Sequence, residues 1–173
     1  VEPVVANPKS PYAILDEHIP AILNEYEELA QAMYEREKEG RGFNFFHFMI
    51  DLSGGPCALK RISGCGAGHE YLAVTPKGDI YPCHQLVGKD EYKMGNVLSQ
   101  DFDMAKSVEL GKINLYTKDE CKNCWAKFYC SGGCIATNAK FAGDANKPYS
   151  IGCELERKRV ECAIALKIMG KVS

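Results

Sequence analysis

The segment CKNCWAKFYCSGGC, residues 121–134, holds four cysteines in the order Cys121-x2-Cys124-x5-Cys130-x3-Cys134. A CxxC turn places two sulfurs on one side of a tight loop, where they can take adjacent corners of a metal cluster. Thiolates held this close repel one another, and metal binding removes that cost because ligation keeps them deprotonated. The two glycines before the last cysteine let the backbone approach a bulky inorganic core and donate N–H groups to it. The segment therefore predicts one or two metal centres.

Three further cysteines extend this pattern in both directions along the chain. Cys65 and Cys83 flank a predicted β-hairpin with Gly78 at its turn, and Cys153 lies at the start of the last predicted helix. The resulting order, C…G-x4-C…C-x2-C-x5-C-x3-C…C, is far more specific than a lone CxxC. The chain has nine cysteines, an odd number, and shows no secretory signal, so we expect a metal framework in a reducing cytoplasm rather than disulfides.

The seven-cysteine order resembles the signature of the SPASM domain, which follows the barrel of radical S-adenosylmethionine enzymes. Residues 71–97, YLAVTPKGDIYPCHQLVGKDEYKMGNV, and residues 124–139, CWAKFYCSGGCIATNA, are similar to the peptide-modifying members of that family. The closest resemblance is to the SCIFF-peptide maturases, which form thioether cross-links in a cysteine-rich, ribosomally made peptide. The resemblance runs from about Cys65 to the end of the chain.

The resemblance implies two auxiliary [4Fe–4S] clusters with interleaved ligands. The first cluster would be bound by Cys65, Cys83 and Cys134. The second would be bound by Cys121, Cys124, Cys130 and Cys153, which is a closed set of four thiolates. The first set leaves one iron without an assigned protein ligand, and Cys57 is either the fourth ligand or a plain cysteine. If that iron is open, we expect it to bind the substrate's cysteine thiolate, lower the thiol pKa and hold the sulfur near the reacting carbon.

The motif that binds the reactive cluster of this family, C-x3-C-x2-C, does not occur in the sequence. Cys130-x3-Cys134 is its only candidate start, and the third position is Thr137. We therefore expect that the chain alone does not cleave S-adenosylmethionine, and we assign it no catalytic residue. Because the chain starts with Val rather than Met, we expect it to be the C-terminal part of a larger enzyme. Its missing region would supply S-adenosylmethionine, a third [4Fe–4S] cluster and the rest of the barrel, and the partner would be the cysteine-rich precursor peptide.

The predicted fold is α+β. Residues 1–56 would form the last strand and helix of a partial (β/α)6 barrel with a connecting helix, and residues 57–173 the SPASM domain. The expected elements are a strand at 1–5, helices at 16–39 and 43–52, a boundary at 53–56, hairpin strands at 71–74 and 80–83, a short strand within 87–97, a weak helix at 99–110 and a helix at 150–169.

Three functions remain open beside the thioether maturase. The chain can instead serve a sulfatase-maturase-like oxidation of a protein Cys or Ser, or be a standalone electron-transfer or zinc-binding module.

The net charge of −2 gives no basic excess for nucleic acid, and no apolar run approaches the length of a membrane span.

Five side chains outside the ligand sets are given structural interpretations. Cys162 is expected to be a small buried hydrophobe rather than a ligand. His84 is expected to face solvent or form a hydrogen bond. Trp125, Phe128 and Tyr129 lie among the ligands, and we expect them to form a hydrophobic shell that keeps water from the clusters.

Overall fold

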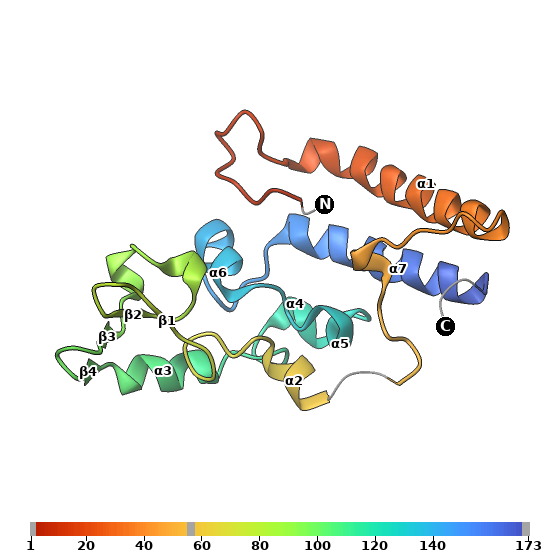
Figure 1. The fold of residues 1–173 in the computed structure, drawn as a ribbon. Coiled ribbons are helices and arrows are strands. Elements are labelled where there is room, and N and C mark those ends of the chain that lie inside the picture. Colours follow the sequence, from red (N-terminus) through yellow and green to blue (C-terminus); the bar gives the residue numbers. More distant parts are fainter. Residues whose placement is uncertain (1–2, 55–57, 171–173) are drawn as a thin grey trace. The chain divides into compact units, whose positions relative to one another are not determined.

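The computed structural model describes residues 3–54 and 58–170, except the side chains of residues 58 and 60, and divides into two compact units (Figure 1). The terminal unit comprises residues 1–57 and 149–173, and the central unit comprises residues 58–148. No helix within the described ranges combines the length and the apolar character needed to cross a membrane. The assignment of residues 1–56 to a barrel and 57–173 to one domain stays a prediction.

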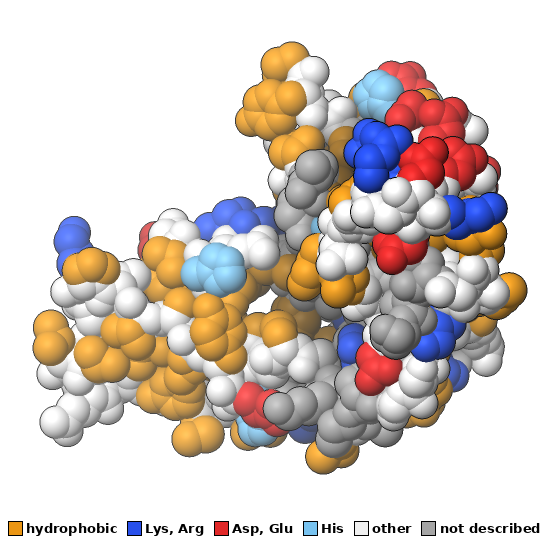
Figure 2. All heavy atoms as spheres, turned by 45° about the vertical axis from the view of Figure 1, so that its right-hand side comes forward, with side chains coloured by type: hydrophobic (Ala, Val, Ile, Leu, Met, Phe, Trp, Pro, Cys, Tyr) orange, Lys and Arg blue, Asp and Glu red, His pale blue; other side chains and the backbone are white. Residues whose placement is uncertain are grey.

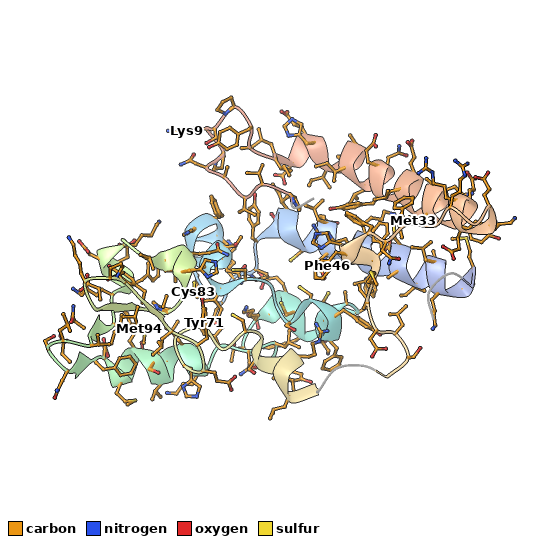
Figure 3. All side chains as sticks on the ribbon, viewed as in Figure 1. Lys9, Met33, Phe46, Tyr71, Cys83 and Met94 are labelled. Carbon is orange, nitrogen blue, oxygen red and sulfur yellow. The ribbon has the colours of Figure 1, made fainter. Side chains whose placement is uncertain are left out.

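The terminal unit is built on two long helices, α1 (Ile19–Lys38) and α7 (Ser150–Ile168), which lie side by side in Figure 1. A short 3₁₀ turn, η1 (Asp16–His18), leads into α1. Tyr26, Ala30 and Met33 recur at helical spacing and are buried, and Met33 lies between the two helices in Figure 3. Acidic and basic side chains gather over α1 in Figure 2, on its solvent face. The predicted helices at 16–39 and 150–169 are therefore confirmed.

Two predicted elements of the terminal unit are wrong. Residues 43–52 form only a 3₁₀ turn, η2 (Phe46–Phe48), in a segment that otherwise has no regular secondary structure. Phe45 and Phe48 pack edge to face at 4.8 Å, and Phe48 is 1% exposed, so the aromatic rings reach the core without a helix. Residues 3–5 form no strand, because they have no neighbouring strand to pair with among the residues that the structure describes.

The central unit contains a four-stranded antiparallel sheet in the order β1-β2-β3-β4. Its strands are β1 (Ala73–Val74), β2 (Asp79–Tyr81), β3 (Gly95–Asn96) and β4 (Asp101–Phe102). The predicted hairpin is confirmed: Gly78 has φ +84° at the turn, and its N–H donates to the carbonyl of Thr75 at 2.8 Å. The predicted helix at 99–110 is shorter than expected, since β4 occupies its start and α3 covers only Met104–Gly111.

The remaining elements of the central unit are short, and six cysteines lie on them or between them. They are α2 (Ala58–Ser63), η3 (His84–Leu86), η4 (Asp90–Tyr92), α4 (Asp119–Lys122), α5 (Lys127–Cys130), α6 (Ile135–Thr137) and a π-helical turn, η5 (Asn138–Ala142). The core beneath them includes Leu86, Ile135 and Ala136, which adjoin cysteine positions in the sequence. Packing of these neighbours anchors the cysteine backbone.

Candidate iron–sulfur site

Cys65, Cys83 and Cys134, the predicted ligands of the first cluster, come together in the central unit as free thiols. Burial raises the pKa of the Cys83 thiol, and the neighbouring thiols of Cys134 and Cys65 raise it further. Backbone N–H groups of Gln85 and Leu86 donate to the Cys83 sulfur and act in the opposite direction. These N–H donors favour the thiolate, which is the form that binds iron.

A glycine-rich turn follows Cys65 and leads into β1, the first strand of the hairpin before Cys83. Gly66 has φ +70°, and its carbonyl accepts N–H groups from the next turn of the chain, at residues 69–71. The N–H of Gly68 donates to the carbonyl of Pro82 at 3.0 Å, immediately before Cys83. This bond ties the turn after Cys65 to the backbone beside Cys83, so the two cysteines are positioned by one hydrogen-bonded frame.

Gln85 connects Cys83 to Cys134. Its side-chain amide donates to Cys134 Sγ at 3.8 Å, while its backbone N–H donates to the sulfur of Cys83. The ammonium of Lys140 donates to the Gln85 carbonyl, which holds this residue from the far side. Gln85 thus contacts two of the three sulfurs, in the way that outer-shell donors surround iron–sulfur ligands.

Cys121 and Cys124, two of the predicted ligands of the second cluster, lie at α4 and just after it. The N–H of Cys121 donates to the carbonyl of Lys118 at 3.0 Å, and the N–H of Cys124 donates to the carbonyl of Cys121 at 3.1 Å. Burial raises the pKa of the Cys121 thiol, Lys118 lowers it, and the Cys124 thiol raises it. The CxxC turn therefore brings two sulfurs together as expected.

The other two predicted ligands of the second cluster lie on different elements. Cys130 ends α5, and its N–H donates to the carbonyl of Ala126 at 3.0 Å. Cys153 lies in the first turn of α7, in the terminal unit. The structure thus keeps three members of the set in one unit, and the joint ligation with Cys153 remains a prediction. Cys57 lies outside the described residues, so its role as a fourth ligand of the first cluster is also a prediction.

The loop between Cys130 and Cys134 has an unusual backbone and two buried side chains beneath it. Ser131, Gly132 and Gly133 all adopt left-handed conformations, with φ of +59°, +78° and +74°. The ammonium of Lys118, 2% exposed, donates to the Gly132 carbonyl at 2.7 Å, and the buried Asn138 amide donates to it at 3.3 Å. Sequence inspection missed Lys118 and Gln85 because a polar residue near a cysteine motif carries no signal of its own burial or contacts.

The exposure and contacts of the side chains near the cysteines confirm some of the predictions and contradict others. His84 is exposed and hydrogen-bonded through Nδ1 to the Tyr71 hydroxyl at 3.1 Å, as expected, and Tyr71 and Cys83 lie in the same region of Figure 3. Cys162 is buried and donates to the carbonyl of Tyr26 at 3.6 Å, so it behaves as a core residue. Trp125 is 51% exposed, so the predicted shell against water is not closed at this residue.

The donor set suits iron–sulfur ligation, since the clustered groups are thiols with N–H donors at their sulfurs. A single tetrahedral zinc ion needs sulfurs at about 2.3 Å from the metal, and therefore close to one another. Across residues 3–54 and 58–170, no three His, Cys, Asp or Glu side chains are arranged to hold one metal ion. A preformed zinc site is thus not seen in those ranges.

Residues 65–125 match the family model for SPASM, described as an iron–sulfur cluster-binding domain. The sequence prediction of a SPASM domain is thus confirmed for residues 65–125.

Among curated proteins, the chain is similar to enzymes named mycofactocin maturase. The chain is similar to the mycofactocin maturase MftC of Mycolicibacterium smegmatis (strain ATCC 700084 / mc(2)155), with 32% identity over 104 residues, which is 58% of this chain and 25% of the relative. It is 35% identical over 104 residues to MftC of Mycobacterium ulcerans (strain Agy99), covering 58% of this chain and 27% of the relative. The aligned region thus spans about a quarter of the curated relatives it matches.

Two solved structures share the fold. The chain superposes on the histidine-tagged form of anSMEcpe with bound AdoMet with a TM-score of 0.63 and 18% identity, covering 100% of this chain and 46% of that one. It superposes on native anSMEcpe with bound AdoMet and Kp18Cys peptide with a TM-score of 0.56 and 18% identity, covering 99% of this chain and 48% of that one. The combination of helices and a small antiparallel sheet is therefore a known fold.

Proposed function

We propose that this chain holds two auxiliary [4Fe–4S] clusters in a radical S-adenosylmethionine enzyme that modifies a peptide. The observation that carries the proposal is the grouping of thiols in the SPASM domain and the segment after it. The thiols of Cys134 and Cys65 raise the pKa of Cys83, and the thiol of Cys124 separately raises the pKa of Cys121. We assign the first group to one cluster and the second group, with Cys130 and Cys153, to the other.

Residues near the first group of thiols place hydrogen-bond donors at the sulfurs, which favours iron binding. Gln85 and Leu86 offer N–H groups to Cys83, and Gln85 also reaches Cys134. Such donors offset the cost of gathering thiolates in a partly buried place. When bound, a [4Fe–4S] cluster transfers single electrons, and an iron without a protein ligand also acts as a Lewis acid toward a substrate sulfur.

The substrate class follows from the resemblance of residues 71–97 and 124–139 to thioether-forming maturases. We propose a cysteine-rich, ribosomally made precursor peptide, cross-linked from a cysteine sulfur to a carbon of another residue. The similarity to the enzymes named mycofactocin maturase supports a peptide substrate without specifying the bond. The rest of the barrel would supply S-adenosylmethionine and the third cluster, and the enzyme would work in the cytoplasm.

Iron and acid-labile sulfide counts test the cluster assignment. The full-length protein that contains this chain should hold about eight irons in its two auxiliary clusters when it is purified anaerobically. Cys121→Ser should remove about four of these irons. The matched control is Cys162→Ser, which changes another buried cysteine and should keep them all. A full-length protein that contains only the roughly four irons of its third cluster, together with zinc, would contradict the proposal.

A second candidate is oxidation of a protein Cys or Ser, with the clusters used only for electron transfer. The fold that the chain shares with the structure of anSMEcpe with bound Kp18Cys peptide supports this second candidate function. Mass spectrometry of a cysteine-rich peptide after reaction separates the two chemistries. A loss of two hydrogens, one from the cysteine thiol and one from the acceptor carbon, with one thiol consumed indicates a thioether, whereas an unchanged thiol count excludes it.

A further inference from the structure

Lys118 is a lysine in a place where lysines are rare. Its side chain is 2% exposed, although the charged ends of lysines usually remain in water. Moving an ammonium group out of water is unfavourable unless hydrogen bonds and nearby negative charge compensate. The buried position therefore implies that the surroundings of Lys118 supply such compensation.

The contacts of Lys118 join two parts of the cysteine segment. Its Nζ donates to the carbonyl of Gly132 at 2.7 Å, in the loop between Cys130 and Cys134. Its own carbonyl accepts the N–H groups of Cys121 at 3.0 Å and Lys122 at 3.1 Å. One residue thus fixes the start of the CxxC helix through its backbone and the loop after Cys130 through its side chain.

The loop between Cys130 and Cys134 packs closely against the Lys118 side chain. A methyl group added at Gly132 would lie 3.1 Å from Lys118 Nζ and 3.3 Å from its Cδ. The left-handed conformations of the loop turn the Gly132 carbonyl toward the ammonium, and glycine adopts such conformations at little cost. The conformation of the loop between Cys130 and Cys134 therefore depends on the position of Lys118 Nζ.

A fixed positive charge in this place has a consequence for a cluster bound by the neighbouring thiolates. Four thiolate ligands make a [4Fe–4S] cluster negatively charged, and reduction adds one more negative charge. A nearby cation stabilises the more negative state. With an effective dielectric constant near 20, a unit charge about 10 Å away shifts such an equilibrium roughly tenfold.

We propose that Lys118 is a positioning and charge-compensating residue for the cluster that Cys121, Cys124 and Cys130 help to bind. Its buried ammonium holds the loop at residues 131–133 and favours the reduced state of that cluster. The inference rests on the proposed function and deepens it, because it names the residue that sets the redox behaviour of one cluster.

Redox titration followed by electron paramagnetic resonance tests the role of the charge. Lys118→Met keeps most of the length of the side chain and removes its charge and donor, whereas Lys118→Arg keeps the charge. The matched control is Lys112→Met, which removes the same charge at an exposed position six residues earlier. Lys118→Gln, which keeps a donor without a charge, is the second neutral variant in case the Met variant does not bind iron.

The expected result is a tenfold fall in the ratio of reduced to oxidised cluster at a given potential, which is about 59 mV for one electron. This shift should affect one auxiliary cluster in each neutral variant that binds iron, and neither cluster in Lys112→Met. Lys118→Arg should stay near the wild-type potential. Failure of both neutral variants to bind iron, with normal binding by Lys118→Arg, would equally support a need for the charge.

Two outcomes would overturn the inference. One is an unchanged potential of both clusters in a fully loaded neutral variant, and the other is loss of iron in all three variants, which would indicate a packing role alone. A wild-type protein without auxiliary clusters would instead refute the proposed function, so the two failures are distinguishable.

Discussion

Replacement of Gly132 by alanine should destabilise the central unit more than the same replacement at Gly143. Both glycines have φ of +78°, so both variants carry the same cost of a left-handed alanine, about 1–2 kcal/mol. The two sites differ in their surroundings. A methyl group at Gly143 meets nothing within 4 Å, whereas one at Gly132 lies 3.1 Å from Lys118 Nζ and 3.3 Å from Leu115 Cδ2.

The magnitude of the difference follows from how little the neighbours of Gly132 can move. Leu115 is fully buried and Lys118 is held by its hydrogen bond to the Gly132 carbonyl. Overpacking of such a site costs about 1–3 kcal/mol. Gly132→Ala should therefore cost about 2–5 kcal/mol in total, and Gly143→Ala about 1–2 kcal/mol.

Urea unfolding under argon, followed by far-UV circular dichroism, measures the difference. With a typical slope of about 1–3 kcal/mol/M, the midpoint of Gly132→Ala should lie roughly 1 M below that of Gly143→Ala. Gly132→Ala should also bind less iron, because a displaced ammonium group no longer holds the loop before Cys134. Equal midpoints and equal iron contents for the two variants would refute the role given to this loop.

Three further predictions concern single side chains. Gln85→Leu removes the donor 3.8 Å from Cys134 Sγ, so the first cluster should be harder to reduce by about 0.5–1.5 kcal/mol in a redox titration. Burial raises the pKa of Cys162 from 9.0 to about 11, so its contribution to folding should be complete below pH 9 and lost between pH 9 and 11. Urea midpoints measured across that range, in wild type and Cys162→Ala, should converge as the pH rises. Tyr26→Phe removes the hydroxyl that accepts from Arg159 at 3.1 and 3.2 Å, and should cost about 1.5–3 kcal/mol in the free energy of unfolding.

Local patterns were enough to predict several elements. The helices at 16–39 and 150–169 follow from apolar residues at helical spacing, and the hairpin follows from a turn that requires glycine at residue 78. The prediction of a helix at residues 43–52 was wrong because a short apolar run does not by itself specify a helix, and only Phe48 of this run is buried. The strand at 101–102 is too short to leave a pattern.

Local sequence patterns likewise predicted some features of the candidate site, whereas other features depend on contacts between residues that are distant in the chain. The order of the cysteines, together with the resemblance it carries, was enough to predict the SPASM domain and its candidate ligands. The contacts of Gln85 with Cys134 and of Lys118 with Gly132 join residues 49 and 14 positions apart. No local periodicity encodes such pairs, because they exist only after the chain has folded back on itself.

The sequence by itself determined which atoms are available to bind metal, since thiol groups at set spacings are a covalent property of the chain. Only the tertiary structure decided how those thiols are surrounded. Burial of the Lys118 ammonium and the N–H groups directed at Cys83 depend on segments that are distant in the chain. The physical reason is that desolvation and hydrogen-bond geometry are set by all neighbours in space, whereas a sequence motif records only neighbours along the backbone.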